Sequence, residues 1–373
     1  MNPAQLRVAI VHERFTEWAG SERVVEELHT LWPDAPIHAA VVDRSVLPAT
    51  LRDADVRPTG LQHLYRGGTQ YSHLLPLLPA AFRRIDLRGV DLVVTSHHAF
   101  ANRVRAPAGV PVVSYVHAAS RWFWDADERA GEVGGAMGRA GLTVFAATQR
   151  GPDRAAAGRL RGAVANSRYT AGKVAENWLR DAEVVPPPVD VTWLTPDENV
   201  EREGFFLFVG RLVPVKRADL AVAAADRAAV PLVVVGDGRL RTRLETEAGP
   251  TVQFVGTGDR AMLLDLYRRC RAVVFPGVEP FGIVPVEAQA CGAPVIAAAV
   301  GGALETVAHG TTGFLYGATP GQEADALASV LANFDGEHYD SARIRQNAER
   351  FTPERFRTDF SAELDRLVTP RIT

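Results

Sequence analysis

The chain has few cysteines and no long apolar run. Only Cys270 and Cys291 occur among its 373 residues, and two isolated cysteines predict neither a disulfide framework nor a zinc site. No apolar stretch approaches the roughly 18 residues that a transmembrane helix needs. The first residues, MNPAQLRVAIVHE, lack the charged start and apolar core of a signal peptide. The sequence therefore predicts a cytoplasmic protein, either soluble or peripheral at the inner face of the membrane.

Lysine is also scarce. The chain has 41 basic residues, of which only Lys173 and Lys216 are lysines, and its net charge is −3. The mildly basic N-terminal half does not indicate binding to nucleic acid, but it permits approach to an anionic surface or acceptor. Because arginine is used almost everywhere else, the compact point charge kept at Lys216 is informative.

A third absence is the G-x-G-x-x-G pattern that follows the first strand of a dinucleotide-binding domain. The segment after that strand is HERFTEWAGSERV, in which Gly20 is the only glycine. This weakens the interpretation as a Rossmann dehydrogenase, because the pyrophosphate fingerprint needs glycines where the backbone approaches the ligand. A methyl group at Ala19 is tolerable only without a positive φ, so we expect phosphate to approach Gly20 instead.

Short apolar runs alternate with amphipathic stretches along the whole chain. RVAIVH, LVVTSH, PVVSYVH and AVANS occur in the first half, and FFLFVG, PLVVVG, VQFVG, AVVFP and PVIAAA in the second. Apolar strands alternating with helices predict parallel sheets covered on both faces. Two such sets predict two Rossmann-like, doubly wound α/β domains, at residues 1–187 and 188–352, joined by the proline-rich segment 184–194.

Two glutamates, with seven residues between them, stand in the run PGVEPFGIVPVEAQACGAPVIA. Glu279 lies in a loop after a buried strand, and Glu287 lies on a helix expected from about Ile283 to Ala290. The first turn of that helix offers unpaired backbone N–H groups, which attract a diphosphate. One carboxylate is then placed for the hydroxyls of a sugar and the other for those of a ribose, although a lone pair at this spacing is also compatible with ordinary solvated glutamates.

A basic pair lies upstream, in FFLFVGRLVPVKR. Arg211 belongs to the turn after a strand, and Lys216 stands at the entry of the next helix. Both are expected to face the same phosphates from the opposite wall and to supply charge-assisted contacts that stabilise a leaving diphosphate. The alternative is that they are surface charges.

Taken together, these segments resemble a known family. FVGRLVPVK, VVVGDG, FVGTGDR, EPFGIVPVEAQACGAPVIA and GGALETV are similar to the donor half of the retaining glycosyltransferases of family 4, which have the GT-B fold. The segments VHERFTEWAGSERVVEELHTLWPDAPIHA and YVHAASRWFWD resemble the branch that contains bacterial O-antigen mannosyltransferases. The resemblance implies an acceptor-side N-terminal domain, a nucleotide-sugar-binding C-terminal domain, and a last helix, about 353–373, that packs back on the N-terminal one.

The resemblance also implies roles for individual residues. His117, at the end of an apolar strand, is expected to contact the donor sugar or its β-phosphate, since polar groups at strand carboxyl ends face the ligand crevice; otherwise it is a structural histidine. The expected catalytic residues are His117, Arg211, Lys216 and Glu279. The expected donor-binding residues are Gly20, Arg211, Lys216, Gly236, Asp237, Gly256, Thr257, Glu279, Phe281, Gly282, Ile283, Val284 and Glu287.

Acceptor contacts are less well indicated. His97 also ends a strand, and Trp122 and Trp124 follow His117 in an aromatic cluster. Exposed aromatic rings pack against sugar faces and lipid-linked acceptors, whereas most such clusters are simply core. We expect His97, Trp122 and Trp124 to be the acceptor residues, with a saccharide, a lipid-linked molecule or a small hydroxyl compound as the acceptor.

No metal site or cofactor is expected. Asp125 and Asp127 spell the Asp-x-Asp of metal-dependent transferases, but Arg211, Lys216 and a helix N-terminus already supply the positive field that a cation would provide. The triplet also occurs at Asp53 and Asp55, in a loop without other functional signals.

The sequence thus predicts a metal-independent, retaining hexosyltransferase that moves a sugar from a nucleoside diphosphate to a hydroxyl group. The site is expected in the cleft near the linker. The branch resemblance favours mannose from GDP-mannose, with UDP- or dTDP-sugars as the alternative. A GT-B epimerase or phosphorylase, or a binding module without activity, remains open; a pyridoxal-dependent phosphorylase would need a Schiff-base lysine, and only Lys173 is unassigned.

Overall fold

Seven short parallel strands form the sheet of the N-terminal unit. In the computed structural model, which describes residues 6–67, 71, 73–125 and 136–369, the strand order is β3-β2-β1-β4-β5-β6-β7. The strands are β1 (Val8–His12), β2 (Ile37–Ala39), β3 (Val56–Pro58), β4 (Leu92–His97), β5 (Val112–Val116), β6 (Gly162–Ala165) and β7 (Glu183–Val184). β1 and β4 are buried at every residue, which is why they read as continuous apolar runs.

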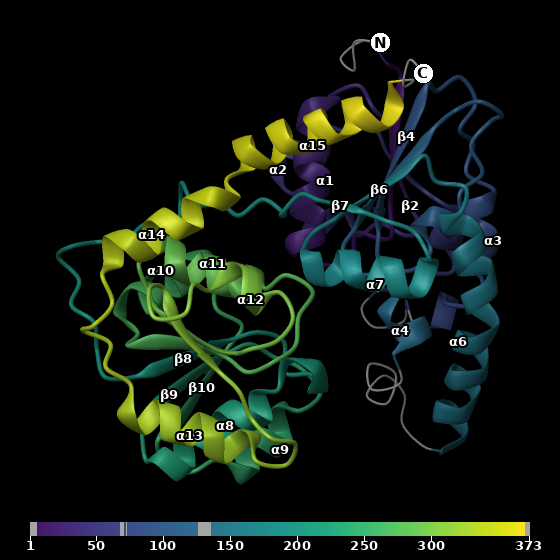
Figure 1. Cartoon of the computed structure of the whole chain (residues 1–373). Coiled ribbons are helices and arrows are strands. Elements are labelled where there is room, and N and C mark those ends of the chain that lie inside the picture. Colours follow the sequence, from purple (N-terminus) through teal and green to yellow (C-terminus); the bar gives the residue numbers. More distant parts are fainter. Residues whose placement is uncertain (1–5, 68–70, 72, 126–135, 370–373) are drawn as a thin grey trace. The chain divides into compact units, whose positions relative to one another are not determined.

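Helices cover both faces of this sheet (Figure 1). The elements are α1 (Gly20–Leu31), η2 (Arg44–Val46), α2 (Ala49–Arg52), η3 (Gly60–His63), α3 (Leu78–Arg83), η5 (Ala101–Arg103), α4 (Arg121–Trp124), α6 (Ala136–Ala157), α7 (Arg168–Trp178) and α15 (Pro353–Val368). α1 and α15 pack in one core cluster, in which Phe356, Phe360 and Leu364 of α15 are buried with Trp32 and Tyr115. α3 and η5 pack in the cluster on the other side.

The C-terminal unit has a second parallel sheet of six strands, in the order β10-β9-β8-β11-β12-β13. The strands are β8 (Phe206–Val209), β9 (Leu232–Val235), β10 (Val252–Gly256), β11 (Ala272–Phe275), β12 (Val295–Ala298) and β13 (Gly313–Tyr316). All neighbouring pairs are parallel. The predicted pair of doubly wound α/β sheets is therefore confirmed.

Its helices form two layers (Figure 1). α8 (Ala218–Ala228), α9 (Arg241–Glu247) and α13 (Glu323–Asn333) cover one face, and α10 (Arg260–Arg269), α11 (Ile283–Ala290) and α14 (Ser341–Ala348) the other. The short elements are η6 (Pro214–Lys216), α12 (Ala303–Thr306) and η7 (Glu349–Phe351). The predicted bounds of the helix that carries Glu287 are confirmed, and Cys270 and Cys291 are buried free thiols.

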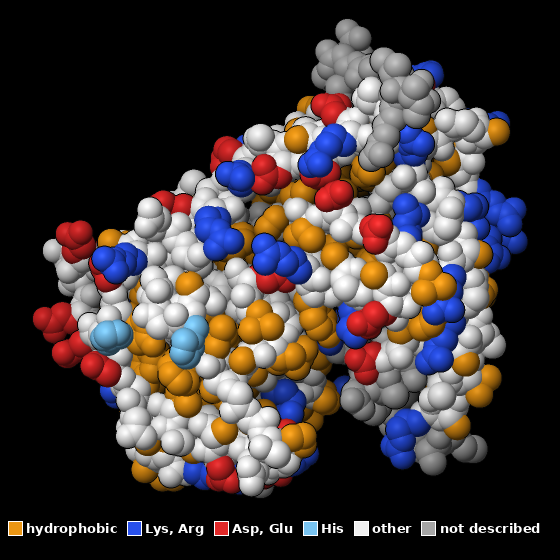
Figure 2. Space-filling model, viewed as in Figure 1, with side chains coloured by type: hydrophobic (Ala, Val, Ile, Leu, Met, Phe, Trp, Pro, Cys, Tyr) orange, Lys and Arg blue, Asp and Glu red, His pale blue; other side chains and the backbone are white. Residues whose placement is uncertain are grey.

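The chain divides between Pro188 and Val189. One unit comprises Met1–Pro188 with Pro353–Thr373, and the other Val189–Thr352. The division falls at the end of three consecutive prolines, 186–188, which cannot continue a helix. In Figure 2 acidic side chains gather on the outer edge of the C-terminal unit, and Lys and Arg side chains on the edge of the N-terminal unit that carries α3 and α6. Within the described residues, no helix has the length and apolar character to span a bilayer.

Candidate functional site

The crossover in the C-terminal sheet brings two loops together. β8 is hydrogen-bonded to β9 on one side and to β11 on the other, so the chain reverses its direction of sheet growth between β8 and β11. In parallel α/β sheets, ligands bind outside the carboxyl ends of the strands at such a switch point. Residues 210–217 follow β8 and residues 276–282 follow β11, so both loops emerge at this edge.

The two loops are joined by an ion pair. Lys216 Nζ lies 2.5 Å from Glu279 Oε1, with side chains 21% and 17% exposed. η6, which begins at Pro214, holds Lys216 in the loop, and Arg211 is exposed five residues earlier. The structure therefore brings together Lys216 and Glu279, two of the four predicted catalytic residues.

Backbone packing builds the neighbouring wall from the loops after β8, β9 and β10. Gly236 has φ +143°, and a Cβ at this position would lie 1.9 Å from the carbonyl oxygen of Gly210. Gly236 N donates to Gly256 O at 2.7 Å. Only glycine permits this approach, so Gly236 and Gly256, both predicted to bind the donor, bring the carboxyl ends of β8, β9 and β10 into direct contact. Asp237 accepts from Gly238 N and Arg241 Nη1, and Thr257 is exposed.

α11 begins at the same edge. Its N-cap, Gly282, has φ +90°, and no side chain caps the helix. Phe281 is buried, whereas Ile283 and Val284 in the first turn are half-buried. Glu287 accepts from the hydroxyl of Tyr267 at 3.1 Å, a contact that fixes its carboxylate one turn into the helix. The N-terminus of α11 thus lies between Glu279 and Glu287 in the sequence, and the N-terminus of a helix can bind an anion.

A second polar cluster lies at the carboxyl ends of β1, β4 and β5. Ser96 Oγ lies 2.8 Å from His117 Nε2 and 3.0 Å from His12 Nδ1, and His12 Nε2 lies 3.2 Å from Glu22 Oε1. His98 stacks on His117 with ring centroids 4.6 Å apart. Sequence reasoning identified His117 but missed Ser96, His12 and Glu22, although His12 and Ser96 stand at strand ends.

The electrostatics of this cluster keep His117 neutral. Burial, with a further contribution from His12, lowers the pKa of His117 to about 3. Burial is the largest single influence on Glu22 and raises its pKa, but the hydrogen bond and charge interaction with His12, together with hydrogen bonds from Ser21 and the backbone, outweigh it, so the net shift of the pKa is downward. Gly20 opens α1 next to this cluster, and Ala19 has φ −141°, which satisfies the condition set by its methyl group.

Glu13 organises the loop after β4. Its Oε1 accepts from the backbone N–H groups of His98, Ala99, Phe100 and Ala101, at distances between 2.6 and 3.2 Å. The side chain is 2% exposed. This role was not predicted from the sequence, although an acidic residue directly after the first strand was a sequence feature that could have indicated it.

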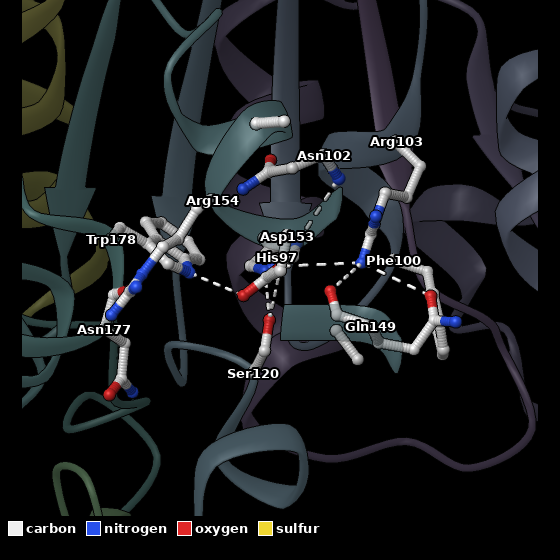
Figure 3. A network of polar contacts seen from close by, with 12 residues as sticks. His97, Phe100, Asn102, Arg103, Ser120, Gln149, Asp153, Arg154, Asn177 and Trp178 are labelled. Carbon is white, nitrogen blue, oxygen red and sulfur yellow. Dashed lines mark hydrogen bonds and ion pairs between the residues drawn. The ribbon is translucent and has the colours of Figure 1, made fainter. Parts of the chain in front are cut away.

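His97 is part of a buried network centred on Asp153 (Figure 3). His97 Nε2 lies 3.2 Å from Ser120 Oγ, which donates to Asp153 Oδ1. Asp153 Oδ2 accepts from the indole N–H groups of Trp178 and Trp124. Burial raises the pKa of Asp153 despite these donors.

This network bears on the three predicted acceptor residues. His97 has no exposed surface. In this structure its ring contacts buried neighbours such as Ser120 and is not open to an acceptor. The ring of Trp124 is half-buried and lies under Arg154, with its guanidinium carbon 4.7 Å from the ring centroid. The side chain of Trp122 lies outside the described residues, and Phe123 beside it is core.

The Asp-x-Asp motif is only partly described. Of the Asp-x-Asp pair, Asp125 is described, whereas Asp127 lies outside the described residues. Among the residues that the structure describes, no group of three His, Cys, Asp or Glu side chains is placed to hold a metal ion. Metal independence stays a prediction.

We expect stability to fall steeply on mild acidification. Burial depresses the pKa of His38, His97, His98 and His117. The unfolded chain therefore binds more protons than the folded one below about pH 6.5, and each such histidine removes about 1.4 kcal/mol of unfolding free energy per pH unit down to its folded pKa. Urea unfolding at pH 7, 6 and 5 measures this. His117→Asn should reduce the dependence of the unfolding free energy on pH by the equivalent of about one proton. His63→Asn, at an exposed position, should leave that dependence unchanged. Equal pH dependence in the two variants would contradict the assignment of His117.

The C-terminal unit matches a described protein family. Residues 194–351 match the family model described as "Glycosyl transferases group 1". D-inositol 3-phosphate glycosyltransferase of Jonesia denitrificans is 34% identical over 241 residues, which cover 54% of this chain and 56% of that protein. The protein of the same name from Mycobacterium tuberculosis (strain H37Ra) is 37% identical over 171 residues, 40% of this chain and 36% of that protein. The chain thus spans about half the length of the curated relatives it matches, or less.

Solved structures resemble the whole chain. HepE from Anabaena in complex with UDP and glucose has a TM-score of 0.65 and 21% identity, covering 97% of this chain and 100% of that one. Sucrose-phosphate synthase from Thermosynechococcus elongatus has a TM-score of 0.71 and 20% identity, with 96% and 98% covered. At this identity the likeness shows the fold alone, and the predicted GT-B fold is confirmed.

Proposed function

We propose that this protein is a retaining glycosyltransferase that moves a hexose from a nucleoside diphosphate to a hydroxyl acceptor. The observation that carries the proposal is the meeting of Lys216, Glu279 and the N-terminus of α11 at the switch point between β8 and β11. This switch point lies within residues 194–351, which match the glycosyl transferase model. A basic side chain, a helix N-terminus and hydroxyl-binding carboxylates are together what a nucleotide sugar requires.

We propose a role for each predicted residue of the C-terminal unit. Arg211, Lys216 and the first turn of α11 stabilise the charge that develops on the leaving diphosphate. Glu279 orients sugar hydroxyls, and Glu287 binds the ribose from the position that Tyr267 fixes. The loops at Gly236, Asp237, Gly256 and Thr257 flank the base.

In the N-terminal unit we assign His117 to the donor sugar or its β-phosphate and Gly20 to phosphate approach. His117 is neutral near pH 7, and its Nε2 is engaged by Ser96. No partner of its Nδ1 is found among the described residues, so this nitrogen is the ring atom we assign to the ligand. Trp124 is the acceptor contact we retain.

Retention at the anomeric carbon follows from same-face attack. A retaining hydrolase uses a carboxylate nucleophile about 5 Å from its partner acid. At this site Glu279 is held by Lys216 and Glu287 by Tyr267, so neither is an evident nucleophile. We propose that the departing phosphate oxygen accepts the proton of the acceptor hydroxyl while that hydroxyl attacks the anomeric carbon.

Two classes of donor are proposed. The resemblance to the O-antigen branch favours mannose from GDP-mannose, whereas the UDP present in the HepE complexes favours a UDP-sugar. The coverage of the inositol phosphate glycosyltransferases does not extend to their whole length, so we do not transfer their acceptor. The mildly basic N-terminal half supports a cytoplasmic protein, peripheral at the membrane, with an anionic or lipid-linked acceptor.

The decisive experiment is product analysis with labelled donors. The whole chain is incubated with GDP-mannose, UDP-glucose, UDP-N-acetylglucosamine and a dTDP-sugar, each with a mixture of saccharide and lipid-linked acceptors. We expect release of nucleoside diphosphate and a new glycoside from one donor class. Conversion of the donor to its epimer would favour an epimerase, and binding without turnover of any donor would contradict the proposal. Thermal shift identifies the donor first, because a ligand at 100 times its Kd adds about 2.7 kcal/mol of stability.

We expect transfer to survive chelation. Protein groups neutralise the diphosphate at the proposed site, so initial rates in excess EDTA should stay within about twofold of those without it. The control adds Mg²⁺ or Mn²⁺ to the chelated enzyme. Complete loss with EDTA, restored by either cation, would show that Asp125 and Asp127 were dismissed wrongly.

A fragment of Val189–Thr352 tests the division of roles. It keeps its own core, including Phe351, and we expect it to bind UDP or GDP in calorimetry but to transfer no sugar, because His117 and the acceptor residues are absent. Measurable transfer by this fragment would refute the assignment. If the N-terminal unit bound the nucleotide and this fragment did not, the donor site would have to be assigned to the N-terminal unit.

A further inference from the structure

The N-terminal unit contains a pocket of about 660 Å³ away from the polar cluster of His117. β2, β3, η3 and α3 form its walls. Its apolar lining comes from Leu61 and from one face of the α3 segment, Leu77, Ala81 and Ile85. Leu78 and Phe82, on the adjacent face of α3, are buried in the core cluster, against which Ala81 and Ile85 also pack. Because Ala81 has a small side chain, it does not fill the pocket, and Leu77, which also lines the pocket, is 45% exposed.

His38 lines this pocket without a hydrogen-bond partner among the described residues. The side chain comes from β2, where His38 is opposite Val11 and Arg57 on the neighbouring strands. The residue is only 7% exposed, and no hydrogen bond or ion pair joins it to a described residue. Burial and the nearby Arg57 lower its pKa to about 4. A neutral imidazole offers one donor and one acceptor. The ring nitrogens of His38 are not among the fully enclosed atoms that lack a partner, so a molecule in the pocket can reach them.

The rim of the pocket carries an uncompensated positive charge. Arg57 is paired with Asp55 and Arg88 with Asp86. Arg84 also lines the pocket and is exposed, and it forms no ion pair with a described residue. The charges of the two ion pairs cancel, so Arg84 leaves the rim with a net charge of one positive unit.

We propose that this pocket is a binding site for an amphipathic anion, in which an apolar chain lies against α3, the anionic head faces Arg84, and a polar atom reaches His38. Apolar walls with a few convergent polar groups are typical of small-molecule sites. The occupant carries a single carboxylate or a phosphate ester on an aliphatic chain. This site is distinct from the donor site of the C-terminal unit, and nothing in the proposal depends on glycosyl transfer.

Calorimetric titration of the whole chain with octanoate and with octyl phosphate tests the proposal and distinguishes the two head groups. We expect saturable binding of one molecule per chain, with a Kd on the order of 0.1–1 mM for a ligand of this size. Octanol, which lacks the charge, should bind at least about threefold more weakly. Failure of both anions to bind, or equal affinity for octanol, would overturn the proposal.

Variants locate the site. Arg84→Ala should weaken binding about three- to tenfold, the scale of one charge-assisted contact at the surface. His38→Phe keeps the ring volume without its nitrogens and should weaken binding about tenfold. Ala81→Phe, which fills the pocket, should abolish binding. Arg139→Ala removes one exposed charge of the same unit on α6 and should change the Kd less than about twofold. Unchanged affinity in Arg84→Ala, whose exposed side chain is not needed for folding, would refute the site even if the buried variants misfold.

Discussion

Lys216→Ala is expected to lower kcat/KM for sugar transfer by roughly 10²- to 10³-fold, the scale of losing one preorganised charge contact to a developing anion. Lys173→Ala is the matched control, because these are the only two lysines of the chain and Lys173 pairs with Glu176 on the exposed face of α7. Steady-state kinetics with the donor identified by product analysis measures both. We expect the loss in kcat as well as in kcat/KM, since the contact is stronger in the transition state.

The ion pair with Glu279 makes a double-mutant cycle informative. Lys216→Ala leaves Glu279 half-buried without its cation, and Glu279→Gln leaves the lysine without its anion. If both act on the same bound donor, the double variant should lose less activity than the product of the two single losses. Near-normal turnover in Lys216→Ala and in Arg211→Ala would remove the basis for the proposed donor site.

Glu13→Ala is expected to lower the free energy of unfolding by about 3 kcal/mol or more. Four backbone N–H groups donate to one carboxylate oxygen in a buried setting, and a buried donor left without an acceptor costs about 1–3 kcal/mol. Solvent penetration and rearrangement of the loop recover part of the total. Urea unfolding followed by fluorescence gives the difference, with the pH held at 7.

Two further variants distinguish hydrogen bonding from general destabilisation. Glu13→Gln keeps an oxygen acceptor and should cost clearly less than alanine. Glu17→Ala, four residues later on a more exposed side chain, should stay within about 0.5 kcal/mol of the wild type. A loss in Glu13→Ala no larger than that in Glu17→Ala would show that the loop after β4 does not depend on this carboxylate.

The longer interior strands could be predicted from the sequence because their residue composition alone indicates a buried strand. VAIVH in β1 and AVVF in β11 are β-branched or aromatic runs buried on both faces, and such runs have few other stable arrangements. β2, β3, β7 and β13 were not identified. β3, β7 and β13 are edge strands of two to four residues, and β3 contains an arginine and a proline. β2 lies inside the sheet but has only three residues, so neither length nor pattern distinguished these four strands from loops.

Contacts between loops were harder to predict than the elements that carry them. The pairing of Lys216 with Glu279 depends on β11 lying beside β8 instead of β10, and strand order is not written in the local pattern. His97 and His117 both end apolar strands, yet one is enclosed around Asp153 and the other retains some exposure. Sequence periodicity places a residue at a strand end but does not tell which neighbours will cover it.

The burial of α15 in the N-terminal core has a consequence for biosynthesis. Residues 1–188 leave the ribosome well before Phe356, Phe360 and Leu364, which follow the whole C-terminal unit. At about 5–20 residues per second, roughly 10 to 30 s pass before these side chains reach Trp32 and Tyr115. During that interval the first-made unit has an uncovered apolar surface, and by its end the later-made unit has all of its own sheet, which is complete at Tyr316. The part of the chain that is synthesised first is therefore the part that finishes folding last.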